Sequence, residues 1–553
     1  MIRSTLLTLA SAASLWLAMP AAAGDAPIVK APAGTLRGEA LDGVDAFRGI
    51  PYAQAPTGRL RWRPPVAAEP WRGVRDATRF GPACHQPPSR PESIYAPADT
   101  PAMSEDCLSL NVWAPTQTAA DKTPEQAPVF VWIHGGALSS GAGSEPMYDG
   151  ERLAAQGVVA VTINYRLGVL GYLAHPQLSE ESDDGVAGNY GLLDQIQALR
   201  WVQENIAAFG GDPANVTIAG ESAGALSVMY LMAAPPAHGL FHKAIAQSAY
   251  MISTPALRDT VHGTPSAEDA GLALARAIEV RSLPRLRAMD AQALTVQAAM
   301  SGFFPLGNVD GKVLPTQPIA AFDTGKQARV PILAGFNEGE IRSLRFLLPP
   351  PPPDAAAYEA EIRSRYGDLA EAMLQRYPGT DLDEAMLATT RDAMYGWTSE
   401  RLVRSQTALG QPSFLYYFDH GYPEADAKGL HAFHAGEIPY ALGTTDRVSP
   451  GWPRIPDTDA EKRLSDAMLA YWVSFARDGV PAAAGEAEWR PYGDARAYMA
   501  FDREPRSGEH LMPGMFELMD EVVCRRRAKG DLPWHWNVGI IAPTLPDGAA
   551  GCR

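Results

Sequence analysis

The sequence predicts an α/β protein built on a central, mostly parallel sheet flanked by helices. Short apolar, β-branched runs alternate with longer stretches whose apolar residues have helical spacing, a pattern typical of parallel strands joined by crossover helices. The expected central strands are Val129–Ile133, Val158–Asn164, Val216–Ala219, Ala244–Gln247, Val330–Ala334 and Phe414–Phe418. Leu192–Ala208 is expected to be a helix, with Asp194 in its first turn, where the helix dipole favours a carboxylate.

The remaining segments predict edge strands and loops. Residues 34–61 read as short strands of an antiparallel edge, with Asp42-Gly43 as a tight turn. Residues 85–106 are rich in proline and predict a loop. The run Pro349–Pro353 predicts a stiff spacer, with Asp354 capping the helix that follows.

Composition and charge narrow the class of protein. The 553 residues are 46% hydrophobic and 20% charged, which is ordinary for a globular chain, and the net charge is −16. An acidic balance of this size disfavours nucleic acid as a partner. Because large α/β units exceed the usual domain size, we expect residues 24–553 to form a single domain.

The N-terminus has the pattern of a secretory signal peptide. Arg3 precedes the apolar run Leu6–Met19, and Ala21-Ala22-Ala23 offers a cleavage site before Gly24. The apolar run is too short to favour the alternative, a membrane anchor. We therefore expect residues 1–23 to be removed and the protein to be exported, periplasmic or secreted, without stable membrane insertion.

The four cysteines fit an oxidising compartment. Cys84 and Cys107 flank the proline-rich segment, and Cys524 and Cys552 lie near the C-terminus, so we predict these two disulfide pairs. The Cys-x-x-Cys spacing typical of many zinc sites is absent from the sequence, and no metal is expected.

Gly220-Glu221-Ser222-Ala223-Gly224 is the strongest catalytic motif. It follows the apolar run Asn215–Ala219 and precedes the helix-forming run Ala225–Ala234. Such a strand–turn–helix context distinguishes a G-x-S-x-G nucleophile turn from a chance glycine-rich turn. The sharp bend tolerates only small neighbours, so Ser222 is the candidate nucleophile.

A serine nucleophile needs a base, and the base needs an orienting carboxylate. In serine turns of this type the order along the chain is serine, acid, histidine. Four downstream histidines are candidates for the base: His420, His431, His434 and His510. Spacing alone does not choose among them.

Two longer stretches resemble signatures of the type-B carboxylesterase and cholinesterase family. Residues 105–112 (EDCLSLNV) are similar to one signature, and residues 209–224 (FGGDP through GESAG) to the other. Matching landmarks run from about Gly49 to Gly443. The resemblance implies an α/β-hydrolase fold with helical and loop insertions over an active-site gorge. It also implies that the Cys84–Cys107 disulfide closes a loop at the gorge rim.

The resemblance assigns the acid and the base. The family's acid stretch matches Gly335–Ile341, which places the acid at Glu340, although Ile341 stands where the family has glycine. Glu338, which precedes a glycine, is the alternative acid. His434 opens a stretch, HAGEIPY, that matches the family's base. Because the base must be neutral, activity is expected to fall as pH drops through roughly 6 to 7.

The resemblance also implies the oxyanion hole and the activity. Its donors are the backbone N–H groups of Gly136, Ala137 and Ala223, with Ala137 replacing a glycine that many members carry. The implied activity is hydrolysis of small or medium organic esters through an acyl-enzyme. No cofactor and no partner beyond a small-molecule ester are expected, and the sequence indicates no oligomeric state.

Three alternatives remain open at the level of sequence. One is a non-catalytic adhesion protein of the same fold, which the retained serine, acid and histidine disfavour. Another is an interfacial lipase, disfavoured because residues 85–106 hold few bulky apolar groups. The third is a hydrolase of amides or carbamates. The candidate pocket residues are Leu138, Tyr250, Phe303, Phe304, Phe346, Trp397 and Phe433.

Overall fold

A wide mixed sheet organises the chain in the computed structural model, which describes residues 26–90, 92–97, 102–116, 126–534 and 536–552. In spatial order its strands are β14 (Pro505–Glu509), β13 (Ala497–Phe501), β12 (Ser413–Phe418), β11 (Ile332–Asn337), β10 (Lys243–Gln247), β9 (Gly211–Glu221), β7 (Ala127–Ile133), β8 (Val159–Ile163), β6 (Ser109–Pro115), β4 (Val44–Pro51) and β3 (Glu39–Ala40). Neighbours from β8 to β13 are parallel, and the outer pairs are antiparallel. The predicted α/β class is confirmed.

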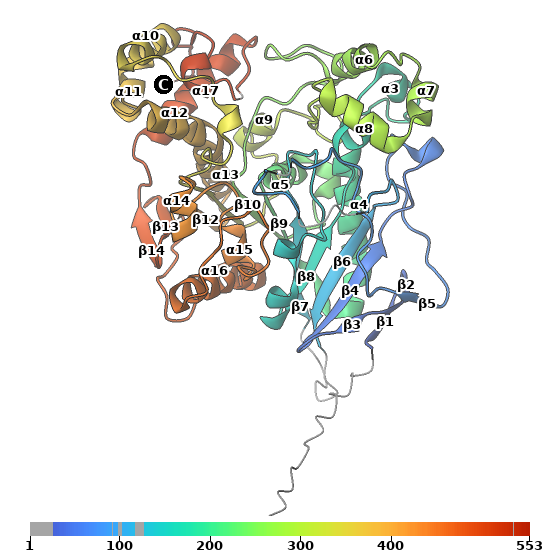
Figure 1. Cartoon of the computed structure of the whole chain (residues 1–553). Coiled ribbons are helices and arrows are strands. Elements are labelled where there is room, and N and C mark those ends of the chain that lie inside the picture. Colours follow the sequence, from blue (N-terminus) through green and yellow to red (C-terminus); the bar gives the residue numbers. More distant parts are fainter. Residues whose placement is uncertain (1–25, 91, 98–101, 117–125, 535, 553) are drawn as a thin grey trace, which may run out of the picture.

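Helices cover both faces of this sheet and gather at one end of it. Their bounds are α1 (Glu151–Ala155), α2 (Gly168–Tyr172), α3 (Pro176–Glu180), α4 (Tyr190–Asn205), α5 (Ala223–Ala233), α6 (Ala267–Ala277), α7 (Leu283–Ala288), α8 (Ala291–Met300), α9 (Pro318–Asp323), α10 (Ala355–Tyr366), α11 (Ala370–Arg376), α12 (Leu382–Arg391), α13 (Trp397–Ala408), α14 (Pro423–Ala427), α15 (Ile438–Ala441), α16 (Asp459–Asp478) and α17 (Met515–Lys529). In Figure 1, α6–α8 form one group at the upper end, and α10–α12 with α17 form another. None of the helices among the described residues is long and apolar enough to cross a membrane.

Alternating side chains of the central strands bury both faces of the sheet. Val129, Val131 and Ile133 of β7 join the apolar core that includes residues of α4, α5 and α13. Phe130 and Trp132 of the same strand join the core on the other face, which includes residues of α16. Burial on both faces explains why the sequence shows continuous apolar runs here rather than a polar–apolar alternation.

Several sequence expectations hold in detail, and the strand expected over Val330–Ala334 is displaced. β11 begins at Ile332 because Pro331 has no N–H to donate to a ladder. Asp354 caps α10, accepting the Ala357 N–H at 2.8 Å as predicted. Asp42-Gly43 forms the turn between β3 and β4, with Gly43 at a φ of +72°.

Two expectations are wrong: the position of Asp194 in its helix and the sheet to which residues 34–37 belong. α4 begins at Tyr190, so Asp194 lies past its first turn, where it is fully buried and pairs with Arg166 at 2.7 Å instead of the helix dipole. Gly34–Arg37 is β2, but it pairs with β1 (Ile28–Ala31) and β5 (Val74–Asp76) in a separate three-stranded sheet. Residues 1–25 lie outside the described part, so the signal peptide and the single-domain boundaries stay predictions.

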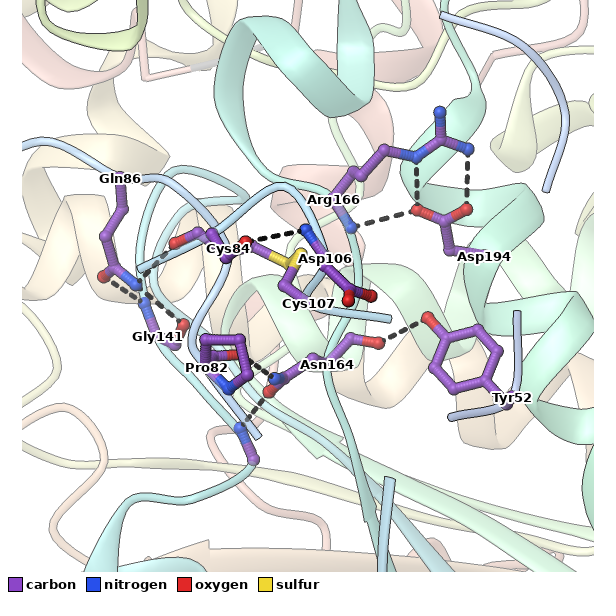
Figure 2. Close-up of a disulfide and its surroundings, with 12 residues drawn as sticks. Tyr52, Pro82, Cys84, Gln86, Asp106, Cys107, Gly141, Asn164, Arg166 and Asp194 are labelled. Atoms are coloured by element: carbon purple, nitrogen blue, oxygen red, sulfur yellow. Dashed lines mark hydrogen bonds and ion pairs between the residues drawn. A yellow bond between two sulfur atoms is a disulfide. The ribbon is translucent and has the colours of Figure 1, made fainter. Parts of the chain in front are cut away.

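Both predicted disulfides are present. Cys84 is bonded to Cys107, and Cys524 of α17 is bonded to Cys552. Figure 2 shows the first of these within a network of hydrogen bonds that reaches several neighbouring loops.

Candidate active site

Ser222 occupies a strained turn between β9 and α5. Its φ of 55° and ψ of −120° lie outside the regions that side chains of L-residues favour, and such strain costs of order 1–3 kcal/mol unless the surroundings enforce it. The neighbouring glycines show how it is enforced. A Cβ on Gly224 would lie 2.0 Å from the Ile133 carbonyl oxygen, and one on Gly220 would lie 2.6 Å from the Gly224 backbone. The motif's glycines are therefore required by the close approach of β7 to the turn.

The glycine loop after β7 lies directly beside this serine. A Cβ on Gly135 would come within 3.3 Å of the Ser222 Cβ and 2.8 Å of the Glu221 carbonyl oxygen. Gly136, Ala137 and Leu138 all have positive φ, from 55° to 98°. Within the described residues, the N–H groups of Gly136 and Ala137 donate to no protein acceptor. Successive backbone donors in such a turn form a site for negative charge.

The loop is tied to the Cys84–Cys107 disulfide through Gln86. The Gln86 side chain accepts the Gly141 N–H at 2.9 Å and donates to the Gly141 carbonyl at 3.1 Å. It also donates to the Cys84 carbonyl at 3.2 Å, so one amide spans the disulfide segment and the glycine loop (Figure 2). Gln292 of α8 holds this segment from behind, donating to the Gln86 carbonyl at 3.0 Å.

Glu340 and His434 meet on the other side of the site. Gly339 forms a β-bridge with Phe433, and its N–H donates to the Ala432 carbonyl at 2.8 Å, which brings the two loops together. The fully buried Glu340 carboxylate contacts His434 Nδ1 through one oxygen and accepts the Asn337 N–H at 2.8 Å through the other.

Glu338, the alternative acid, does not contact His434 in the described structure. Its carboxylate lies 3.4 Å from Arg342 and 3.3 Å from Arg391, in ion pairs on the other side of the loop. The structure therefore brings together His434 and Glu340, as the preferred assignment expected.

Two further carboxylates that sequence reasoning missed surround the histidine. His434 Nε2 lies 3.1 Å from an oxygen of Glu221, the residue before the serine. Glu437 is fully buried and accepts hydrogen bonds from Gln247 at 2.9 Å and from Asn337. Glu221 lies in the serine motif and Glu437 in the stretch that His434 opens. The sequence does not indicate that both carboxylates are buried close to His434 and form a cluster of charges with it and Glu340.

This cluster perturbs the titration of His434. Burial lowers the pKa of His434, but the charges of Glu221 and Glu340 outweigh it and raise the pKa well above its usual range. Burial raises the pKa of Glu221, and the charge of His434 opposes this by lowering it. Because the two groups are in contact and interact strongly, they titrate as a coupled pair. In the described residues the Ser222 hydroxyl makes no hydrogen bond, and Nε2 of His434 approaches Glu221 instead.

Aromatic rings connect the histidine with the protein surface. The ring centroids of Tyr395 and His434 lie 5.1 Å apart, and Tyr250 lies 6.1 Å from Tyr395. Trp536 follows at 6.2 Å from Tyr250, and Phe304, 48% exposed, at 5.2 Å from Trp536. We call Tyr395, Tyr250, Trp536 and Phe304 the ring series. The sequence predicted Tyr250 and Phe304 as pocket residues and did not indicate Tyr395 or Trp536.

The other predicted pocket residues lie outside the ring series. Leu138, Trp397 and Phe433 are buried in the cores, whereas Phe346 is 78% exposed and Phe303 is half-buried. Aromatic character alone could not separate these positions, because it is equally typical of a core and of a pocket.

One group of side chains has the composition of a metal site. Ligand atoms of Glu338, Asp419 and His431 lie within 4.8 Å of one another. Each already has protein partners: Glu338 pairs with Arg391, and both His431 nitrogens contact carboxylates, those of Asp419 and Asp426. The two carboxylates raise the pKa of His431 to about 9. The group is therefore an ion-pair network.

An α/β sheet that carries a serine on a strained strand–helix turn, beside a glycine loop and a histidine–carboxylate pair, defines the α/β-hydrolase class of proteins. Within that class the chain belongs to the carboxylesterase family: a sequence model described as "Carboxylesterase family" matches residues 25–517. It is an enzyme of the ester-hydrolase type, since these relatives are named as esterases.

Relatives and solved structures cover most of the chain. A fumonisin B1 esterase of Sphingopyxis macrogoltabida is 38% identical over 86% of this chain and 86% of its own. The para-nitrobenzyl esterase of Bacillus subtilis is 36% identical over 82% of this chain and 90% of its own. A solved para-nitrobenzyl esterase structure superposes with a TM-score of 0.76 at 33% identity, covering 89% of this chain and 99% of that one.

Proposed function

We propose that the enzyme hydrolyses carboxylic esters through an acyl-enzyme, with Ser222 as nucleophile, His434 as base and Glu340 as acid. The proposal rests on the proximity of two parts of the site, the serine turn and the histidine–carboxylate pair, which come from different loops. The strained Ser222 turn lies against Gly135 of the glycine loop, while buried Glu340 holds His434 by Nδ1 with Nε2 turned toward the serine's neighbour, Glu221.

In the proposed reaction Ser222 Oγ attacks the ester carbonyl as His434 Nε2 takes its proton. Glu340 accepts the Nδ1 hydrogen bond, which fixes the tautomer and stabilises the imidazolium that forms. Since Nε2 contacts Glu221 in this structure, the imidazole must turn from that carboxylate toward Oγ when substrate enters. Catalytic hydrogen bonds commonly tighten in this way on binding.

The oxyanion hole is assigned to the N–H groups of Gly136, Ala137 and Ala223. The first two have no protein acceptor in the described structure, and Ala223 begins α5, where the helix dipole adds positive potential. These donors stabilise the tetrahedral oxyanion. The alcohol then leaves with a proton from His434, and water deacylates Ser222 by the same route.

The ring series supports esters that carry a bulky apolar group. Its rings pack on one another from His434 to the surface, and aromatic side chains bind apolar groups without requiring charge. The esterase relatives include ones named for fumonisin B1 and for para-nitrobenzyl esters, consistent with organic esters larger than acetates of simple alcohols.

A panel of chromogenic esters, varied separately in acyl and alcohol groups, tests the proposal. We expect hydrolysis, and we expect Ser222→Ala to reduce kcat by about 10⁴-fold or more with an unchanged melting temperature. Turnover of the variant at the wild-type rate would refute Ser222 as the nucleophile.

We also propose export, with cleavage after Ala23. The charged, apolar and small-residue regions of residues 1–23 and the two disulfides support it. The intact mass of protein recovered from the producing cells should correspond to a chain that begins at Gly24. A mass that retains residues 1–23 in the exported fraction would contradict the proposal.

A further inference from the structure

A small cavity lies between α17, the chain after it, and the segment of residues 393–397 that leads into α13. Its walls are mostly apolar and include Met251, Met394, Val522 and Trp534. About 20 Å³ of it is open to the centres of water-sized atoms, and the heavy-atom centres of one small bonded group can share such a space because bonded atoms lie closer together than separate waters do. One charged side chain, Arg526 of α17, also lines it.

Arg526 is buried without a charged partner. Its side chain is 1% exposed, and within the described residues neither Nε nor Nη2 makes a hydrogen bond. Burial lowers the pKa of Arg526 below its ordinary value, but a guanidinium stays protonated in proteins. An unpaired buried cation strongly destabilises the folded protein. An anion bound beside the guanidinium would remove that cost.

The unpartnered edge of Arg526 is one that binds carboxylates elsewhere in this molecule. Arg166 donates from Nε and Nη2 to the two oxygens of Asp194, at 2.7 Å each. Arg61 donates from the same two nitrogens to Glu105, at 2.7 and 2.6 Å. This fork matches the spacing of carboxylate oxygens, whereas a spherical ion cannot engage it in the same planar way.

We propose that this cavity binds a small monocarboxylate of about acetate size. Nε–H and Nη2–H of Arg526 donate to its two oxygens, and the apolar wall receives its carbon end.

Two residues that line the cavity are sequence neighbours of the ring series. Met251 follows Tyr250 and Met394 precedes Tyr395, two members of the ring series. The lining contains none of Ser222, Glu340 and His434, so a carboxylate bound at Arg526 does not contact the catalytic atoms.

Thermal unfolding of the full-length protein tests the site without reference to turnover. At equal ionic strength, 100 mM acetate or formate should raise the melting temperature by about 1–3 °C relative to 100 mM chloride, because a ligand of the folded state stabilises it. Arg526→Met should lose this difference and, lacking a buried unpaired charge, should melt no lower than the wild type in chloride.

Two further variants keep the test decisive. Lys529→Met removes a charge from the exposed end of the same helix and should retain the acetate effect. Arg526→Lys keeps the charge but lacks the fork, so at least threefold more acetate should be needed for the same shift. Equal melting temperatures of the wild type in acetate and chloride, or an acetate effect that persists in Arg526→Met, would overturn the proposal.

Discussion

The serine side and the histidine side of the active site are built in different ways. Around Ser222 the geometry comes from the backbone: a left-handed residue, glycines at van der Waals limits and a loop held by Gln86. Around His434 it comes from buried carboxylates, those of Glu221, Glu340 and Glu437.

The difference predicts separate responses to perturbation. A backbone turn holds the same shape at any pH, whereas a cluster of three buried carboxylates and an imidazole changes its charge with pH. We therefore expect changes on the serine side to reduce the rate uniformly across pH, and changes on the histidine side to alter the pH dependence.

The largest effect is expected from Glu340→Gln. The amide cannot hold the imidazole tautomer that accepts the serine proton, so kcat should fall by about 10²–10⁴-fold. Glu338→Gln is the matched control, because Glu338 pairs with Arg342 and Arg391 and not with His434; it should stay within about threefold of the wild type. Steady-state kinetics of both variants on one ester decide the matter, and the reverse ranking would move the acid to Glu338.

A smaller effect is expected from Gln86→Ala. Loss of both hydrogen bonds to Gly141 frees the loop that carries the oxyanion donors, so kcat should fall by about tenfold with little change in KM and no shift along the pH axis. Gln203→Ala is a matched control, since Gln203 also donates two hydrogen bonds to backbone carbonyls, at 2.8 and 3.0 Å, and one acceptor, Pro213, lies near the start of β9, at the opposite end of that strand from Ser222.

The two glutamine variants separate positioning from general stability. Both should lower the free energy of unfolding by about 1–2 kcal/mol through lost hydrogen bonds. Only Gln86→Ala should lower kcat. An equal loss of kcat in both would show that Gln86 acts through stability alone.

The smallest effect in rate, but the clearest in pH dependence, is expected from Glu221→Gln. The Glu221 charge contributes to the raised pKa of His434, so the wild-type enzyme should need a pH above the roughly 6 to 7 of an ordinary imidazole to free its base. Removing that charge lowers the pKa, and the acid limb of kcat/KM should move to lower pH. Profiles from pH 5 to 10 measure it, and an unmoved limb would count against this coupling.

Sequence reasoning predicted the parts of the site that depend on local backbone chemistry. The serine turn needs Gly220 and Gly224 because β7 passes close to it, and both glycines are part of the G-x-S-x-G motif that the sequence shows. The assignment of His434 and Glu340, by contrast, required resemblance to a family. Their contact depends on the Gly339–Phe433 bridge, which joins loops that are distant in the sequence.

The features that sequence reasoning missed are those defined by burial. Glu221 and Asp194 look like ordinary polar residues on a turn and on a helix, yet both are buried against a charged partner. Arg526 reads as one of three consecutive arginines at a helix end, and only its burial distinguishes it from Arg527. No periodicity or spacing carries that information.

The ends of the wide sheet have a consequence for how copies of the protein meet. An open sheet exposes a row of backbone N–H and C=O groups at each edge, to which strands of another molecule can add. Here one edge is β3, only two residues long, and the other is β14, which begins with Pro505 and carries the exposed Arg506. A short strand, a proline and a charge all discourage such addition, so the sheet can be broad without being a template for aggregation.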